Sequence, residues 1–463
     1  MIAACHHPVD PGPDLQIVGE TLRLRPGDPV PEASPWFDGT AVHLTGARGE
    51  VLGVQVLHRK GGAATLVLPK TEVHGFDVKR VHVSRPSTAM YGGDSRGKGD
   101  YPDELIANDS PQTDPAYFTI TIPKDLAPGT YTGQLAVAQQ QFPVTLDVAP
   151  VTLDLPLASW AEYHPDSLGG TIEQPSAAEF ACSKMFRAHG MLLAPPMNAV
   201  AVRARAEQLE GAPYVPVDLG REPVKAAAEA RTWKGLVPGQ KPFAIPIDEP
   251  KKAQRDDVRK MADAIHEANR EIIYAVTDEP RDEYGDSIDL YIPQTPKLTD
   301  TYLRWTYNGK SPGAGSMVVD APAPGPRTWG WIMWRYKIAI WYVWDALYWT
   351  DRYNHKTEPP RVLDAAKDAA SFDDGEDVGN LDGVLALPGC HPTLRLEAMR
   401  RGMQDRALLD LASTCDLEKT NELAKRMIPR ALGDASGSPA WPSDEAPWEA
   451  ARLELLKIAS CSR

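Results

Sequence analysis

Several kinds of sequence signal are absent from this chain of 463 residues, and each absence narrows its possible functions. No stretch reaches the ~18 apolar residues of a membrane span, because charged residues interrupt even the most apolar region, residues 329–349. The net charge is −14, so the chain lacks the basic surface that nucleic-acid binding requires. Hydrophobic residues make up 42% and charged residues 24%, which is typical of globular proteins and excludes wholesale disorder and coiled coil.

Cysteine and histidine show no pattern suited to a metal. None of the five cysteines lies in a CxxC pair, and the eleven histidines are scattered along the chain. No P-loop, GxGxxG or GxSxG motif appears in the strand–turn–helix context that such sites require. We therefore expect no metal, no cofactor and no histidine-dependent nucleophile.

Cys5 is the cysteine with the most distinctive surroundings. It follows Ile2-Ala3-Ala4, which resembles the end of a bacterial lipoprotein signal, although the charged and apolar parts of such a signal are missing. The alternative is a chance cysteine near a flexible N-terminus, residues 1–14. A lipid on Cys5 would tether the protein to a membrane of the bacterial envelope, and an extracellular location is the other expectation for an exported protein.

The other four cysteines can pair if the protein is exported to an oxidising compartment. Cys415 and Cys461 bracket the last part of the chain and are the expected pair, but the sequence does not fix the connectivity. The four candidates are Cys182, Cys390, Cys415 and Cys461.

Proline is present in excess, with 43 residues, about 9% of the chain against a usual ~5%. Proline stops helices and marks strand ends and loops. The excess predicts many short strands and shaped loops, and it argues against a helical bundle.

Residues 15–153 have the pattern of a β-sandwich, with short or alternating apolar runs separated by turn residues. The polar segment 85–115 predicts a long loop. The expected strands are residues 41–44, 51–57, 64–68, 117–122, 134–137 and 144–148.

Helical and strand-like segments alternate from about residue 154 to 415, which argues for a parallel sheet with helical crossovers. A (β/α)8 barrel of the TIM type is the best match to this length and alternation. The tail, residues 416–463, predicts two helices that form a cap or a small appendix. The expected barrel elements are helices at 177–189 and 251–269 and strands at 191–194, 243–247, 272–276 and 288–292.

The strongest chemical feature is the segment 243–250, where an apolar run ends in Asp248-Glu249-Pro250. Carboxyl ends of parallel barrel strands form active sites. Two carboxyl groups there suit the cleavage of glycosidic bonds, because one of them must protonate the leaving oxygen. Repulsion between the two like charges raises the pKa of one group and so keeps it protonated as an acid. The alternative is a helix N-cap with an acidic first turn. The motif recurs at Asp278-Glu279-Pro280, and spacing alone does not choose between the copies.

Tryptophan provides the second feature. Seven of the twelve lie between Trp305 and Trp349, with tyrosines interleaved. Aromatic faces line carbohydrate clefts, and they also fill cores, which we expect for about half of this set. The proposed substrate-binding aromatics are Tyr307, Trp329, Trp331, Trp344 and Trp349.

The order of these motifs along the chain resembles that of the DUF4091 proteins, which include glycoside hydrolase family 123. The resemblance covers residues 40–412, but residues 386–390 lack the family's usual aromatic before Pro-Gly and the segment 208–240 is short. The motifs are residues 101–105, 128–133, 248–250, 327–331, 344–349, 382–389 and 394–402.

The resemblance implies an N-terminal β-sandwich, a (β/α)8 catalytic barrel and a retaining β-N-acetylgalactosaminidase. In such enzymes the sugar's own acetamido oxygen attacks the anomeric carbon. Asp248 would orient the acetamido group and Glu249 would be the general acid/base, which leaves Asp278-Glu279 as the non-catalytic copy. The expected partner is a glycan. Two alternatives remain: a surface carbohydrate-binding protein without turnover, and a hydrolase for sugars that lack an acetamido group.

Overall fold

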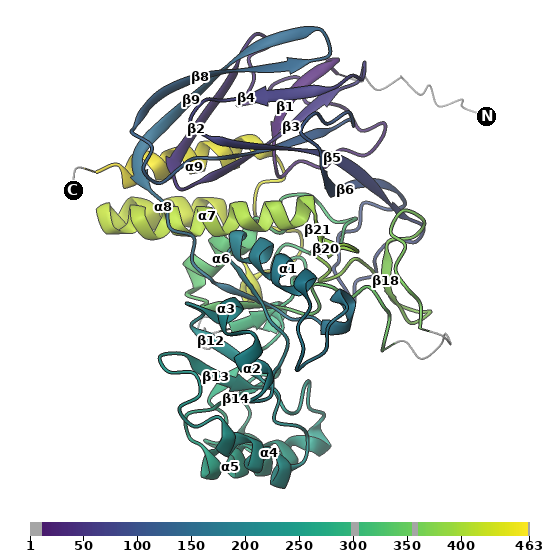
Figure 1. The fold of residues 1–463 in the computed structure, drawn as a ribbon, viewed down its shortest axis with the longest axis vertical. Helices are drawn as coiled ribbons and strands as arrows, with labels where there is room; N and C mark the ends of the chain where they lie inside the picture. Colours follow the sequence, from purple (N-terminus) through teal and green to yellow (C-terminus); the bar gives the residue numbers. More distant parts are fainter. Residues whose placement is uncertain (1–11, 298–304, 354–359, 462–463) are drawn as a thin grey trace.

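The computed structural model describes residues 12–297, 305–353 and 360–461. The predicted lipidation site, Cys5, lies outside these residues. Figure 1 shows the N-terminal β-sheets at the top, the helices α9 and α7 beneath them, and the parallel strands with their short helices below. In the described part of the chain, no helix is long and apolar enough to cross a membrane.

The N-terminal region forms two β-sheets that face each other across one hydrophobic cluster. Successive side chains of a strand point to opposite faces of the sheet. In β4, Ala64 and Leu66 are buried while Thr65 and Val67 are exposed. The first sheet has the order β1 (Leu15–Gly19), β3 (Val51–His58), β7 (Ala116–Thr121), β5 (Glu72–Val83), β6 (Gly99–Ala107). The second has the order β2 (Val42–Arg48), β9 (Gln140–Thr152), β8 (Gly129–Val137), β4 (Ala64–Val67).

The prediction of one long loop over residues 85–115 is wrong in its middle, where β6 lies. The sequence of β6 is polar and contains Pro102, which argues against a strand. Because β6 is the edge strand of its sheet, the missing N–H of Pro102 is tolerated there. The ladder with β5 shifts register between Lys79 and Arg80, opposite this proline.

The second region contains parallel strands that lie next to one another in chain order. They form two four-stranded sheets, β11-β10-β17-β16 and β12-β13-β14-β15, and two parallel bridges link the sheets: Met197 with Val217, and Gln294 with Tyr307. These strands are short and mostly buried, as expected for strands covered on both faces. The strands are β10 (Ser159–Ala161), β11 (Met191–Leu193), β12 (Tyr214–Val217), β13 (Lys241–Ala244), β14 (Ile273–Val276), β15 (Leu290–Tyr291), β16 (Trp305–Tyr307) and β17 (Ile340–Val343).

The helices between these strands vary in length. The amphipathic pattern correctly predicted α1 and α5, and the buried face of α5 carries Val258, Met261, Ala262 and Ile265. The helices are η1 (Pro165–Leu168), α1 (Ala177–Ala188), α2 (Ala201–Ala204), α3 (Ala206–Leu209), α4 (Pro223–Thr232), η2 (Lys252–Gln254), α5 (Arg255–Ala268), η3 (Asp282–Tyr284), η4 (Thr295–Lys297) and α6 (Thr328–Tyr336).

Two short hairpins and a set of helices complete the chain. The helix α7 lies against α6, where Gly330 and Gly402 meet. A Cβ atom on Gly330 would lie 1.7 Å from the Gly402 carbonyl oxygen, so this contact requires glycine. The elements are β18 (Ala370–Asp373), β19 (Val378–Asn380), β20 (Ala386–Leu387), β21 (His391–Pro392), α7 (Leu394–Cys415), α8 (Leu417–Met427), η5 (Leu432–Asp434) and α9 (Glu445–Ala459).

The C-terminal helix α9 is not a peripheral appendix. It packs against β2 and β9 on one side and against α7 on the other (Figure 1). Trp448, fully buried, lies edge-on to Trp331 of α6. The tail therefore forms part of the layer between the sandwich and the parallel strands.

Buried charges join the sandwich to this helical layer. Arg401 on α7 donates to Glu20 over 2.5 Å and also pairs with Glu50, and both acids come from the sandwich. Arg452 on α9 reaches Glu50 as well, over 3.1 Å. Arg400 donates to the second carboxylate oxygen of Glu20 over 2.8 Å. At most 4% of each of these side chains is exposed, so every charge depends on its partners.

Two disulfides join distant parts of the chain. Cys415 pairs with Cys461, as expected, and ties the end of α7 to the C-terminus. Cys182 of α1 pairs with Cys390, which lies between β20 and β21. The second disulfide links segments 208 residues apart, a connectivity that the sequence left open.

We predict that Glu50→Gln lowers the free energy of unfolding by about 3–5 kcal/mol, because Arg401 and Arg452 would remain buried without their shared carboxylate. Urea denaturation measures the change. Asp154→Asn is the control, since Asp154 pairs with Lys124 at the surface and should change the free energy by less than ~1 kcal/mol. Equal effects of the two substitutions would contradict the prediction.

We also predict that unreduced digests contain two cross-linked peptide pairs, Cys182 with Cys390 and Cys415 with Cys461. Mass spectrometry before and after reduction identifies them. Protein made in an oxidising compartment but carrying free thiols at these positions would contradict the pairing.

Candidate active site

The carboxyl ends of the parallel strands carry most of the polar side chains of the cleft. Glu162 follows β10, Asp218 follows β12, and Asn308 follows β16. The strand β13 ends at Ala244, earlier than predicted, so Asp248 and Glu249 lie on a short segment beyond it. Parallel strands bring these positions to one end of the sheet, where active sites of such folds lie.

Thr277, just after β14, connects the two predicted catalytic residues. Its hydroxyl donates to Asp248 Oδ1 over 2.5 Å and accepts the backbone N–H of Glu249 over 2.6 Å. Partial desolvation by the cleft walls raises the pKa of Asp248, and the Thr277 hydrogen bond opposes that rise. Glu249 has a φ of +41°, an uncommon backbone conformation for a residue other than glycine. The hydroxyl therefore fixes the position of both acids.

The Glu249 carboxylate has two side-chain donors. The Tyr307 hydroxyl donates to Oε1, and Gln294 Nε2 donates to the same oxygen over 3.3 Å. Burial, together with the charge of Glu249, raises the pKa of Tyr307, which keeps its phenol protonated as a donor. The prediction that Tyr307 belongs to the site agrees with this position.

Neither predicted acid caps a helix. The residue before η2 is Lys251, and the residue before α5 is Gln254. The alternative of a helix N-cap at Asp248 is therefore wrong.

The aspartate of the second Asp-Glu-Pro copy forms hydrogen bonds within its own turn. Asp278 is buried and accepts hydrogen bonds from Arg281 over 2.9 Å and from the Tyr284 hydroxyl over 2.7 Å. Burial favours a higher pKa, but these donors outweigh it and hold the pKa of Asp278 below its ordinary value. An acid whose oxygens are used within its own turn is poorly placed to transfer protons to a ligand.

Glu162 is an acid of the cleft that sequence reasoning missed. It accepts a hydrogen bond from Tyr342, whose ring stacks on Trp160 with centroids 4.2 Å apart. Burial raises the pKa of Glu162 to about 7, despite the opposing hydrogen bond from Tyr342. A single glutamate after a three-residue strand gives no local sequence signal.

Three cavities meet around these residues. One of about 370 Å³ is lined by Glu162, Asp218 and Asp248. A second of about 260 Å³ is lined by both Asp248 and Glu249, with Tyr307 and Asn308. A third, also about 260 Å³, contains Glu249 without Asp248. Tyr342 and Trp344 line both of the first two cavities, which therefore adjoin.

Trp344 lies in this cleft, as predicted. Its backbone is held by Asn308, whose side chain accepts the Trp344 N–H over 2.9 Å and donates to the Trp344 carbonyl over 3.0 Å. The side chain is partly exposed between the two larger cavities. Its position suits contact with a ligand.

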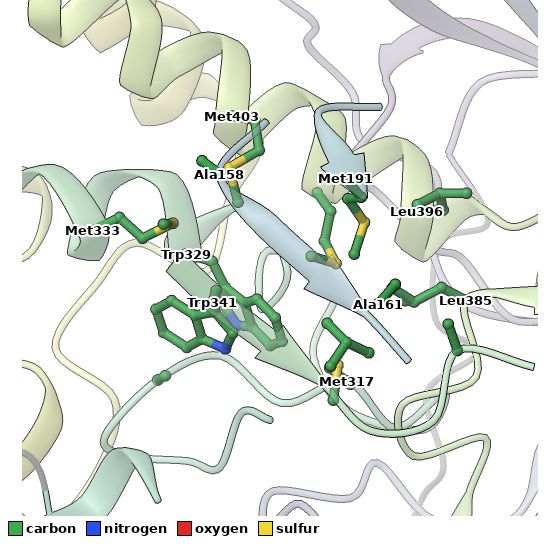
Figure 2. Packing of buried hydrophobic residues seen from close by; sticks show 14 of the residues in the cluster. Ala158, Ala161, Met191, Met317, Trp329, Met333, Trp341, Leu385, Leu396 and Met403 are labelled. Carbon is green, nitrogen blue, oxygen red and sulfur yellow. The ribbon is translucent and has the colours of Figure 1, made fainter. Parts of the chain in front are cut away.

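Three of the predicted substrate-binding tryptophans are instead core residues. Trp329 and Trp331 are fully buried, and only 8% of Trp349 is exposed. Figure 2 shows Trp329 against Trp341, stacked with ring centroids 4.3 Å apart and surrounded by methionine side chains. The Trp329, Trp331 and Trp349 indole N–H groups bond inside the protein, and none of these residues lines a cleft cavity.

The fold is similar to that of a family 123 glycoside hydrolase from Clostridium perfringens, studied for glycolipid glycan hydrolysis. The alignment covers 96% of this chain and 97% of that chain, with a TM-score of 0.61 and 11% sequence identity. A glycosyl hydrolase family 2 member from Bacteroides cellulosilyticus matches less well, with a TM-score of 0.28, 9% identity, and 65% and 44% of the two chains covered. No protein-family model and no curated protein match the sequence. The first similarity establishes a fold of mixed β and α/β regions shared with that hydrolase.

We predict that Glu162→Gln stabilises the protein at pH 8 and has little effect at pH 4. The unfolded glutamate titrates near 4.3 and the folded one at about 7, so the stability of the native protein falls as pH rises between these values. The glutamine variant avoids this loss, which is on the order of 3 kcal/mol for such a shift. Urea denaturation at several pH values measures it, and a pH-independent difference would contradict the assigned shift.

Proposed function

We propose that the protein is a glycoside hydrolase that releases an N-acetylhexosamine, such as β-linked N-acetylgalactosamine, from glycans with retention of configuration. The observation that carries this proposal is the adjacent pair Asp248 and Glu249, which line one cavity beyond a parallel strand and share the Thr277 hydroxyl. The resemblance to glycoside hydrolase family 123 in motif order, together with the similar fold, supports the same assignment.

In the proposed first step, the acetamido oxygen of the sugar attacks the anomeric carbon and the bond to the leaving oxygen breaks. The bonding electron pair goes to that oxygen, which takes a proton from Glu249. Asp248 accepts the acetamido N–H and so aligns and polarises the attacking group. The Thr277 hydrogen bond favours ionised Asp248, as this role requires.

In the second step, water attacks the anomeric carbon of the cyclic intermediate and gives its proton to Glu249. The bond to the acetamido oxygen breaks, and its electron pair restores the acetamide. Tyr307 and Gln294 hold the Glu249 side chain in place through both steps. No nucleophile from the protein is needed, so one acid/base and one orienting carboxylate suffice.

We further propose that strands β10 to β17 close into a (β/α)8 barrel. Their order and the bridges Met197–Val217 and Gln294–Tyr307 support this, because each strand then has a parallel neighbour on both sides. The helical layer is incomplete, with only the single turn η3 between β14 and β15.

We also propose that the protein is exported, as an envelope lipoprotein anchored through Cys5 or as an extracellular enzyme. The two disulfides support export, because such bonds persist in oxidising compartments. A glycan outside the cell would then be the partner.

We predict that Glu249→Gln lowers the rate of hydrolysis of an aryl N-acetyl-β-galactosaminide by about 10²–10⁴-fold, the usual contribution of an oriented general acid. Asp248→Asn should lower it severely as well, because the acetamido group loses its charged acceptor. Glu279→Gln, in the second copy of the motif, is the matched control and should hydrolyse the substrate like wild type.

Wild-type-like turnover by Glu249→Gln would reject the assignment. Aryl glycosides that differ only in the 2-acetamido group test the substrate-assisted route. Hydrolysis of the sugar without this group, with no inhibition by a thiazoline analogue, would favour a different mechanism.

A further inference from the structure

The cavity lined by both predicted catalytic acids defines where the reacting sugar lies. The acetamido group must reach Asp248 while the glycosidic oxygen of the same sugar reaches Glu249. Among the cavities around these acids, in the part of the chain that the structure describes, only one contains both residues. We name it the glycone cavity and define it by Asp248, Glu249, Tyr307 and Asp382.

Asp382 lies in the wall of this cavity without a structural partner. Its Oδ1 atom is buried and has no hydrogen-bond partner among the residues that the structure describes. Burial raises the pKa of Asp382 to about 7, although the charges of Arg395 and Lys310 oppose the rise. Buried polar atoms are rarely left unsatisfied, so this one requires an explanation.

The cationic side chains near Asp382 do not account for its unsatisfied oxygen atom. Arg395 uses its guanidinium on Asp103, over 2.8 Å, and on the carbonyl groups of Met317 and Leu381. Lys310 lines the cavity with its ammonium group 3.5 Å from the Met90 carbonyl oxygen. Asp382 is therefore not part of a buried ion pair like those on α7.

An aromatic pair completes the same cavity. Tyr91, from the sandwich, packs against Phe372 of β18 with ring centroids 4.9 Å apart. Asp320 holds the Tyr91 loop in place, because it accepts the Ser87 N–H over 2.7 Å and the Ser87 hydroxyl over 2.6 Å. A carboxyl group, an ammonium group and aromatic faces together suit a sugar, which has hydroxyl groups on its edge and C–H bonds on its faces.

We propose that Asp382 binds the substrate by accepting a hydrogen bond from a ring hydroxyl of the sugar whose glycosidic bond is cleaved. Lys310 lies at the same wall and can donate to the same sugar edge. This inference rests on the proposed function, since it takes the positions of Asp248 and Glu249 as those of the reacting sugar. The ligand is a terminal N-acetylhexosamine whose hydroxyl at this position is free.

The test compares Asp382→Ala and Asp382→Asn with wild type on an aryl N-acetyl-β-galactosaminide. Asp382→Ala would leave the sugar hydroxyl unpaired inside the cavity, which should lower kcat/KM about 10- to 100-fold. Glu376→Gln is the matched control, because Glu376 is an exposed acid in the β18–β19 hairpin, which precedes Asp382, and should leave kcat/KM unchanged. Asp382→Asn, nearly the same shape, replaces the alanine variant if that one fails to fold.

Substrates that lack one ring hydroxyl at a time identify the contact. The hydroxyl bound by Asp382 is the one whose removal lowers kcat/KM for wild type and has no further effect in Asp382→Ala. If every deoxy substrate lowers kcat/KM equally in both proteins, or if Asp382→Ala retains the wild-type value, the inference is wrong while the proposed function stands.

If wild type hydrolyses none of the glycosides, a binding measurement separates this inference from the proposed function. Calorimetric titration with free N-acetylgalactosamine then decides. Binding that is 10-fold or more weaker in Asp382→Ala than in wild type and Glu376→Gln supports the assignment. Equal binding by all three proteins, or no binding to wild type, overturns it.

Discussion

Buried arginines on α7 are the constraint on which the arrangement of the regions depends. Arg395, Arg400 and Arg401 are almost fully buried, and their carboxylate partners Asp103, Glu20 and Glu50 belong to the sandwich. A charge inside a protein costs several kcal/mol unless its partner is in place. The sandwich therefore has one favourable position on the helical layer, and sliding it would leave several charges unpaired at once.

Because the sandwich is held in this position, residues of both regions line the cleft. The loop that carries Tyr91 leaves the sandwich, and Asp320 of the second region binds it through Ser87. The same loop then forms a wall of the cavity that contains Asp248 and Glu249. The sandwich is thus part of the candidate active site. Its ion pairs with α7 hold it in position, and they thereby determine the shape of a cavity that lies away from these charges.

Short sequence patterns predicted those features of the fold that interactions between residues close in sequence determine. The apolar run before Asp248 and Glu249 indicates a strand, which ends at Ala244, and the amphipathic spacing of α5 indicates a helix, so much of the α/β alternation followed from the sequence. Tryptophan gives no such guide, because its indole is equally suited to a core and to a cleft; Trp329 and Trp344 differ only in what the fold places around them. Thr277 and Asp382 are single polar residues whose roles arise from neighbours distant in sequence.

The acids of the cleft differ in their surroundings. Burial raises the pKa of Asp248, Glu162 and Asp382, to about 7 in the last two, and at Asp248 the Thr277 hydrogen bond opposes this rise. Glu249 is exposed and accepts hydrogen bonds from Tyr307 and Gln294. In the proposed mechanism Glu249 is the acid/base, and its exposed carboxyl group is open to both a ligand and the attacking water.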